Sequence, residues 1–292
     1  MSELSRPRLS KLQRLFTPST RPRSRLAAVT ALATGLLVVA ATAVPSGAAP
    51  SRGDGEGDGA GGGGHHFDAL VFTRTTGFRH DSIPTGIAAI ERMGQRHGFS
   101  VDATEDPATF NDADLAEYEV VIWLSTTGDV LDAEQQAAFE RYIGAGGGYV
   151  GIHAASDTEY DWAWYGGLVG AYFNGHPDQQ QALVKVAGRG NISTRPLPRR
   201  WWRFDEWYNY DHNPRGEVRV LATLDERTYD PGDTGMGDDH PISWCHEYAG
   251  GRAWYTGMGH TEESYSEGLF LSHVLGGIQQ TAGVARFNCG AD

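Results

Sequence analysis

The chain has 292 residues, of which 24 are Lys or Arg and 37 are Asp or Glu, and its formal net charge at pH 7 is −13. Hydrophobic residues make up 40% and charged residues 21%, a globular composition that excludes a disordered or fibrous protein. Residues 1–49 hold seven basic residues and one acidic residue, so the remainder carries 17 basic and 36 acidic residues. Such an acidic surface repels phosphate backbones and anionic lipids, which excludes nucleic acid as a partner.

Residues 1–49 have the order of a secretory signal peptide. A basic stretch precedes the apolar run 26–44, and small residues follow, with Ala43 and Ala49 as candidate cleavage positions. We therefore expect a secreted protein, extracellular or in the cell envelope, without membrane contact after cleavage. The alternative is a signal anchor, because an apolar run of 19 residues is long enough to span a bilayer.

The rest of the chain predicts one folded domain. Residues 50–66 are rich in Gly and Asp and predict a disordered linker. We assign residues 67–286 to the domain and residues 287–292 to a tail. Export permits a disulfide between Cys245 and Cys289. Cys245 lies in an apolar strand pattern and Cys289 in the tail, so we favour a buried Cys245 thiol over the bridge.

Strands and helices alternate in the first half of the domain. Ser82 and Pro84 mark the start of a helix that reaches residue 97. Asp132 and Gln135 form a capping-box pattern for a helix over residues 133–143. The strands predicted around these helices are, in chain order, 67–73, 99–103, 118–125 and 149–152.

This alternation predicts an α/β fold with a mostly parallel sheet and helices on both faces. Beyond residue 180 short strands dominate, and we expect them to add antiparallel strands to the sheet before a last helix at 267–281. They are expected at 182–186, 217–223, 242–248 and 253–256. Ligands of such sheets bind at the carboxyl ends of the strands. Polar segments follow three predicted strands, at 73–80, 125–129 and 153–157.

The sharpest local feature is His153 in the sequence GGYVGIHAA, directly after a predicted strand. Small residues on both sides of one functional side chain are typical of a nucleophile elbow. An imidazole in that position serves as a general base or a metal ligand and is a poor acyl-transfer nucleophile. Asp157 follows four residues later and can reach the same mouth, so we add it to the catalytic candidates.

A second cluster, WWRFDEWYNY at residues 201–210, interleaves aromatic and acidic side chains. If it is extended, Asp205 or Glu206 lies near apolar neighbours, which raises the carboxyl pKa and suits a general acid; we choose Glu206. Indole faces bind the C–H faces of sugars, so the Trp-rich second half predicts a carbohydrate cleft, with a Trp-rich core as the alternative. The candidate substrate-binding residues are Trp162, Trp164, His176, Trp207, Tyr208, His240 and Trp244.

Histidines recur in loops and at strand ends. His80 and His260 are expected to stand beside His153 as catalytic partners. The histidines in such positions are His80, His153, His176, His240 and His260. No pair has the spacing of a helical zinc site, so the sequence specifies no cofactor and a divalent metal stays open. A homo-oligomer stays open as well.

Several long segments resemble the trehalose-utilisation (ThuA-like) family over residues 67–282. The resemblance is carried by FTRTTGFRHDSI, GGGYVGIHAASDT, WYGGLVGAYFNGHP, FDEWYNYDHNPR and DHPISWCHEYAGGRAWYTGMGHT. It implies a flavodoxin-like fold similar to class I glutamine amidotransferases, with His153 where those enzymes have their cysteine nucleophile. Amidotransferase chemistry is therefore not expected. The resemblance also implies a role in trehalose or keto-sugar metabolism.

We thus expect an exported carbohydrate-active enzyme acting on a saccharide or keto-sugar. Acid–base chemistry by His153 and Glu206, assisted by His80, Asp157 and His260, fits hydrolysis, elimination or isomerisation. Two alternatives stay open. One is a non-catalytic sugar-binding module on a degenerate amidotransferase fold, and the other is a metal-dependent hydrolase.

Overall fold

The structure is a computed structural model that describes residues 66–290. The predicted signal peptide, the linker up to residue 65 and the last two tail residues lie outside the described residues. Among residues 66–290, no helix combines the length and the apolar character needed to cross a bilayer.

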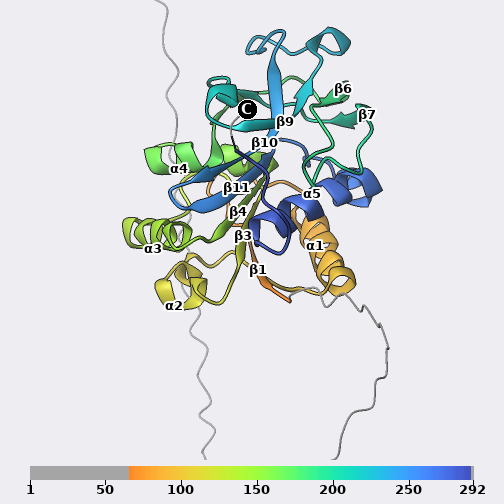
Figure 1. Ribbon diagram of the computed structural model, residues 1–292. Helices are drawn as coiled ribbons and strands as arrows, with labels where there is room; N and C mark the ends of the chain where they lie inside the picture. Colours follow the sequence, from red (N-terminus) through yellow and green to blue (C-terminus); the bar gives the residue numbers. More distant parts are fainter. Residues whose placement is uncertain (1–65, 291–292) are drawn as a thin grey trace, which may run out of the picture. The chain divides into compact units, whose positions relative to one another are not determined.

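A nine-stranded sheet in the order β2-β1-β3-β4-β11-β10-β9-β6-β7 forms the centre of the described part (Figure 1). One half is parallel: β2 (Ser100–Thr104), β1 (Asp68–Phe72), β3 (Val120–Leu124), β4 (Gly148–Ile152) and β11 (Gly251–Thr256). The other half is antiparallel: β10 (His240–Tyr248), β9 (Arg219–Leu224), β6 (Gln180–Val186) and β7 (Arg200–Asp205). The predicted parallel core with added antiparallel strands is confirmed.

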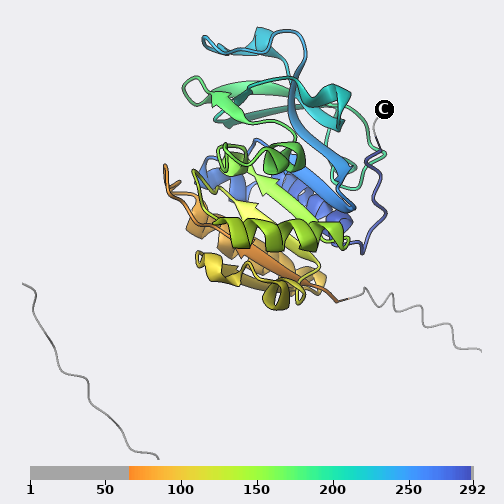
Figure 2. The ribbon, with the colours of Figure 1, turned by 90° about the vertical axis from the view of Figure 1, so that its left-hand side faces the viewer.

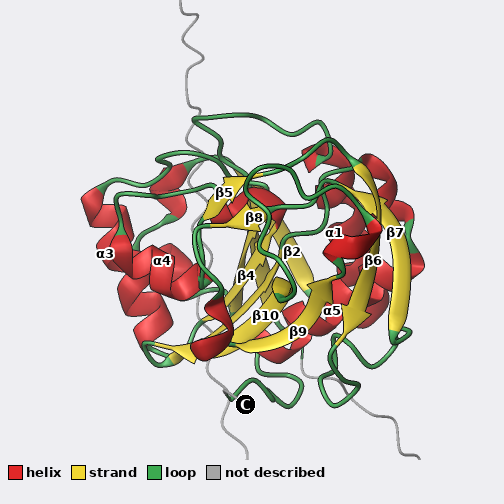
Figure 3. Ribbon diagram, turned by 90° about the horizontal axis from the view of Figure 1, so that it is seen from above, coloured by secondary structure: helices red, strands yellow, loops and turns green. Residues whose placement is uncertain are grey.

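Helices cover both faces of the sheet (Figures 1 and 2). One face carries α1 (Ile83–His97) and α5 (Gly268–Thr281); the other carries α2 (Asp112–Leu115), α3 (Ala133–Gly144) and α4 (Ala163–Val169). A small antiparallel sheet of β5 (Phe173–Gly175) and β8 (Asn209–Tyr210) is seen from above in Figure 3. Short 3-10 helices of the described part are η1 (Pro107–Thr109), η2 (His153–Ser156), η3 (Pro214–Gly216), η4 (Glu226–Thr228) and η5 (Glu262–Ser266).

The local signals explain most of these elements. All five residues of β3 and of β4 are buried, as expected for central parallel strands covered on both faces. Asp132 and Gln135 form the predicted capping box of α3. Helix α1 begins directly after Ser82 with Pro84 in its first turn, as predicted, but the Ser82 side chain makes no cap hydrogen bond. Its hydroxyl donates instead to the carbonyl oxygen of Gly259, 3.4 Å away.

The cysteines form a disulfide, which corrects the preference for a free Cys245 thiol. Both residues are buried. The error lay in treating the end of the chain as a free tail. Asn288 accepts hydrogen bonds from the Arg219 guanidinium through its carbonyl and side-chain oxygens, so this segment packs on the antiparallel half of the sheet and brings Cys289 to β10.

Candidate functional site

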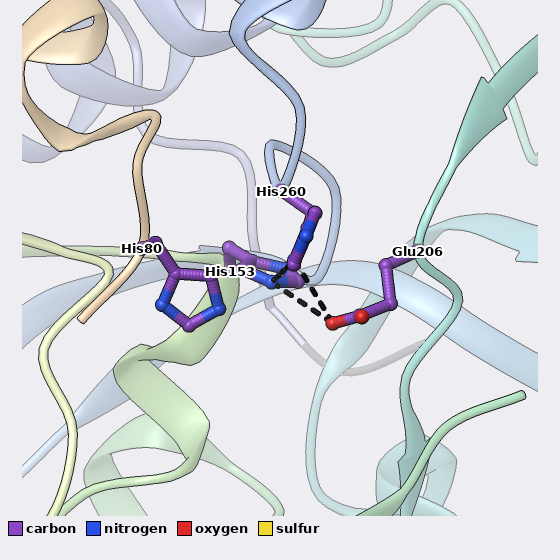
Figure 4. Close-up of side chains that lie close together, drawn as sticks. All are labelled: His80, His153, Glu206 and His260. Carbon is purple, nitrogen blue, oxygen red and sulfur yellow. Dashed lines mark hydrogen bonds and ion pairs between the residues drawn. The ribbon is translucent and has the colours of Figure 1, made fainter. Parts of the chain in front are cut away.

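Four side chains converge beyond the carboxyl ends of the sheet strands (Figure 4). His80 follows β1, His153 follows β4, Glu206 follows β7 and His260 follows β11. The pairing of the strands makes all four run in the same direction, so their carboxyl ends lie on one edge, where α/β sheets bind ligands. We call these four residues the His–Glu centre.

His153 sits on a sharp turn between β4 and η2. Its φ is 52°, in the left-handed region that few non-glycine residues adopt, although histidine is among those enriched there. Gly151, two residues before the turn, has no room for a side chain, because an added Cβ would lie 2.6 Å from the Tyr149 hydroxyl. The backbone therefore has the form of the predicted elbow.

The His153 ring has a defined tautomer in its neutral form. Its Nδ1 is 2.9 Å from the carbonyl oxygen of Gly257, which can only accept, so Nδ1 carries the hydrogen. The lone pair is then on Nε2, which lies 3.1 Å from Nδ1 of His260 and 3.4 Å from Oε2 of Glu206. Tyr208 packs against the ring with centroids 4.2 Å apart, which restricts its rotation.

Glu206 is a buried carboxylate among histidines. Its Oε2 is 3.0 Å from Nδ1 of His260, and its Oε1 is 3.3 Å from Nδ1 of His176. Burial alone would raise the pKa of Glu206, but hydrogen bonds and charges of His153 and His260 outweigh it and hold the pKa well below its usual range. The expectation of a raised carboxyl pKa is therefore wrong, because it considered apolar neighbours and not the histidines.

His80 and His260 complete the centre with opposite shifts. Burial, with the charges of His153 and His260, lowers the pKa of His80 to about 2, so its ring is neutral at physiological pH. Burial would also lower the pKa of His260, but Glu206 outweighs it and raises that pKa. One ring nitrogen of His80 faces the other three side chains (Figure 4), while its buried Nδ1 has no hydrogen-bond partner within residues 66–290.

Asp205 holds the loop that carries His260, a role the sequence analysis did not assign. Its carboxylate accepts hydrogen bonds from the backbone N–H groups of Gly259 and His260 at 2.9 and 3.0 Å. The buried Arg203 guanidinium lies 3.0 Å from the same carboxylate. The adjacent acidic residues Asp205 and Glu206 were the sequence signal for this role. Asp205, the last residue of β7, positions the loop of His260, and Glu206 reaches the centre.

The contacts place Asp157 at the rim. Its carboxylate accepts a hydrogen bond of 2.6 Å from the Tyr160 hydroxyl, and burial raises its pKa. Among residues 66–290 it makes no hydrogen bond or ion pair with the four residues of the centre, and the charge of His153 lowers its pKa less than burial raises it. His176, predicted as a substrate residue, is the rim group that reaches the centre, through Glu206.

Most of the predicted sugar-binding aromatics lie in the core. Trp207 and Trp244 are fully buried and donate to backbone carbonyls of Gln180 and Val169. His240 is fully buried and contacts Glu226.

Trp162 and Trp164 stack on each other at α4, with ring centroids 5.2 Å apart. Of the predicted aromatic residues, only Tyr208 contacts the centre, by packing on His153. For the four predicted tryptophans the structure shows the alternative, a Trp-rich core: Trp162, Trp207 and Trp244 are buried in it and Trp164 packs against it.

Exposed aromatic residues instead line two adjoining cavities, one of which is lined by His260. The first, of about 230 Å³, is lined by Phe78 and His260, and the second, of about 620 Å³, by Trp202 and Phe204. Both are bounded by Gln179, Thr261 and Glu263. The three aromatic side chains are between 52% and 66% exposed. Side chains alternate between the two faces along β7, so Trp202 and Phe204 point outward. This alternation could have identified these two cavity residues from the sequence.

Comparison with known proteins agrees with this architecture. The family model described as ThuA, trehalose utilisation, matches residues 68–281. The chain belongs to the ThuA family. Membership confirms the resemblance seen in the sequence and indicates a carbohydrate-related role.

Solved structures of two ThuA-like proteins are similar to this chain. A protein of Bacteroides uniformis is 26% identical, with a TM-score of 0.63 over 74% of this chain and 91% of its own. A protein of Parabacteroides merdae is 19% identical and shows the fold alone, with a TM-score of 0.64 over 77% of this chain and 93% of its own. No curated protein matches the chain.

The ThuA fold of this chain offers no cysteine nucleophile. The chain has two cysteines, and both are in the disulfide. His153 at the elbow provides a lone pair in place of a thiolate, so the chemistry available at the centre is proton transfer or metal ligation.

Proposed function

We propose that the protein is an exported enzyme that acts on a saccharide or a keto-sugar at the His–Glu centre. Family membership supports the carbohydrate substrate. The signal-peptide pattern of residues 1–49 supports export. The observation that carries the proposal is the convergence of the His153 lone pair, the Glu206 carboxylate and the His260 ring nitrogen within 3.4 Å of one another, beside a cavity lined by His260.

The centre has the groups needed to move a proton. Nε2 of His153 is positioned as a base, and Glu206 stays ionised because its pKa is held low. His260, whose pKa is raised, is the group best suited to carry a proton at neutral pH. We therefore assign the proton-donor role to His260 and make Glu206 the group that stabilises its charge. Hydrolysis, elimination and keto–enol isomerisation each need such a pair.

The adjoining cavities are the proposed sugar cleft. Exposed Phe78 lines the cavity beside His260, and Trp202 and Phe204 line the larger one. Flat apolar rings pack on the C–H faces of sugars, while Gln179 and Glu263 can bind sugar hydroxyls. Two cavities that share Gln179, Thr261 and Glu263 in their linings fit a substrate of more than one ring, with the reacting ring next to His260.

The alternative is a sugar-binding module without catalysis. The strongly lowered pKa values of His80 and Glu206, clustered beside a cavity with the raised pKa of His260, favour an enzyme, because a binding module needs no such shifts. Gathering three histidines, two of them buried, around one carboxylate would serve no purpose in a site that only packs and hydrogen-bonds a sugar.

To test this activity, the full chain is incubated with disaccharides and their 3-keto derivatives, with and without added divalent metals. Products are followed by NMR. His153→Ala is compared with His97→Ala, a change at an exposed residue at the end of α1. We expect product with the wild type and His97→Ala and none with His153→Ala. Sugar binding without product would favour the binding module, and neither binding nor product would contradict a saccharide substrate.

A further inference from the structure

We propose that the His–Glu centre binds one divalent first-row transition-metal ion through a ring nitrogen of each histidine and a carboxylate oxygen of Glu206. Binding of the ion needs no substrate, but its part in the reaction rests on the proposed function. Nothing in the sequence spacing marked this site, because the four ligands come from four segments between residues 80 and 260.

The spacing of the donor atoms fits a metal ion. One donor atom from each residue lies within 4.8 Å of all the others, and three of the separations are 3.0, 3.1 and 3.4 Å. Zinc–nitrogen and zinc–carboxylate bonds are about 2.0–2.2 Å long, so two ligands of a tetrahedral zinc ion are about 3.3–3.5 Å apart. The closest pairs therefore need shifts of a few tenths of an ångström, and donor atoms as much as 4.8 Å apart would move closer by about an ångström.

The hydrogen bonds at the centre leave electron pairs facing one another. In the neutral His153 ring the hydrogen is on Nδ1, so Nε2 and the Glu206 carboxylate both present lone pairs, 3.4 Å apart. The single hydrogen that Nδ1 of His260 can carry must serve both. A cation between these atoms binds all the lone pairs at once, which one hydrogen cannot do.

The surroundings of the ligands resemble those of known metal sites. A metal-bound histidine usually donates its other ring N–H to a carbonyl or carboxylate, which fixes the ring, and His153 donates to Gly257 in this way. Asp205 fixes the backbone of His260. His80 directs a ring nitrogen inward without a hydrogen bond at its buried Nδ1, and a bond from the inward nitrogen to a cation would fix this ring.

The donor chemistry selects the class of ion. Three imidazoles and one carboxylate suit Zn²⁺, Fe²⁺, Ni²⁺ or Mn²⁺, whereas Mg²⁺ and Ca²⁺ prefer oxygen ligands. His260 lines the cavity, so a bound ion would be reachable by a ligand. Such an ion supplies Lewis-acid polarisation of an oxygen, and the carbonyl of a keto-sugar is a suitable target.

A metal ion bound at the His–Glu centre would also change which side chains transfer protons. The lone pairs of His153 and Glu206 would be used in holding the ion, and proton transfer would fall to a group at the rim. His176 is in position, because its Nδ1 is 3.3 Å from Oε1 of Glu206 and its side chain is 42% exposed. The proton-transfer scheme of the proposed function describes the centre without the ion.

The test measures metal directly. The full chain is purified without chelator, stripped with a chelator and equilibrated with Zn²⁺, Mn²⁺ or Mg²⁺ in turn; bound metal is counted by mass spectrometry after gel filtration, and affinity is measured by calorimetry. We compare His80→Gln and His260→Gln with the control His65→Gln/His66→Gln, which removes the histidine pair before the first strand. Circular dichroism checks that each variant is folded.

We expect one equivalent of Zn²⁺ or Mn²⁺ per chain in the wild type and the control, a rise in melting temperature on binding, and no stoichiometric Mg²⁺. Each ligand variant should bind at least a hundredfold more weakly. Less than a tenth of an equivalent in the wild type, or full occupancy in His80→Gln and His260→Gln, would overturn the proposal. A wild type that turns over sugar but binds no metal would overturn the metal site and leave the proposed function standing. A wild type that binds one equivalent of metal but turns over no sugar would uphold the site and overturn the proposed function.

Discussion

Nδ1 of His153 lies 2.9 Å from the carbonyl oxygen of Gly257, and this contact joins the turn after β4 to the loop after β11. The two residues are 104 positions apart in the chain. One hydrogen bond thus fixes the tautomer of the elbow histidine and ties it to the loop that carries His260. The parallel pairing of β4 with β11 is what brings them together.

Replacement of His153 tests the base. His153→Asn should reduce turnover by about two to four orders of magnitude, the usual contribution of a general base. Asn tolerates the left-handed φ of 52°, so the melting temperature should change little, whereas His153→Ala carries an added backbone cost of about 1–2 kcal/mol. Steady-state kinetics and thermal unfolding check this. Full activity in either variant would remove His153 from the mechanism.

Replacement of Asp205 tests the loop support. Asp205→Asn turns one carboxylate oxygen into an N–H₂ donor that faces backbone N–H groups, and it removes the buried charge that pairs with Arg203. We expect a loss of about 1–3 kcal/mol in the free energy of unfolding, measured in urea. Asp211→Asn, at an exposed carboxylate paired with His212, is the control and should change stability far less. Equal effects would show that Asp205 does no special positioning.

The disulfide should stabilise the domain strongly. Cys245 and Cys289 are 44 residues apart, and a cross-link over a loop of that length contributes about 4 kcal/mol in the chain-entropy model. Cys245→Ala/Cys289→Ala should therefore lower the melting temperature markedly, and reduction should lower that of the wild type but not of the variant. A wild type indifferent to reductant would indicate that the two thiols are not joined.

Acid should destabilise the fold through buried His273. Burial lowers the pKa of His273 to about 4 from an ordinary 6.5. The unfolded chain then binds the proton first, so the stability is fully present above pH 6.5 and is lost as pH falls toward 4, by about 3 kcal/mol at most. Urea unfolding at pH 7 and pH 5 should show a smaller drop for His273→Gln than for the wild type. An equal drop would contradict this account.

The aromatic cleft predicts an effect on binding. Trp202→Ala and Phe204→Ala remove exposed rings from the larger cavity and should raise KM about tenfold for a two-ring substrate while kcat stays near the wild-type value. Val284→Ala, at an exposed residue outside both cavities, is the matched control. An unchanged KM in the first two variants would show that the sugar binds elsewhere.

The sequence was sufficient to predict the architecture where hydrophobic patterns were long. The β3 and β4 segments read as buried strands, and the capping box of α3 formed as expected. Short elements were missed: α4 begins at Ala163 after an N-cap residue, Trp162, whose side chain makes no cap hydrogen bond, and β8 has two residues. Such elements form because tertiary contacts stabilise them, and a local pattern does not contain those contacts.

The site was predicted only in part, again because local patterns do not contain tertiary contacts. Loop positions marked His80, His153 and His260 as candidates, but their common meeting point with Glu206 depends on the order of strands in the sheet. Trp207 and Trp244 were misplaced because a Trp-rich core and a sugar platform have the same composition. Only the direction of each side chain separates them, and β7 shows this, with Trp201 inward and Trp202 outward.

The central claim is that the His–Glu centre is catalytic, and the most direct test is the turnover of 3-keto disaccharides by the Glu206→Gln variant. Its melting temperature is measured alongside to check that the variant is folded like the wild type. The amide keeps the shape of the carboxylate and loses the charge that stabilises protonated His260, 3.0 Å away. We predict that kcat falls at least a hundredfold while the sugar still binds. Turnover at the wild-type rate would contradict catalysis at the His–Glu centre and leave the site as a binding pocket.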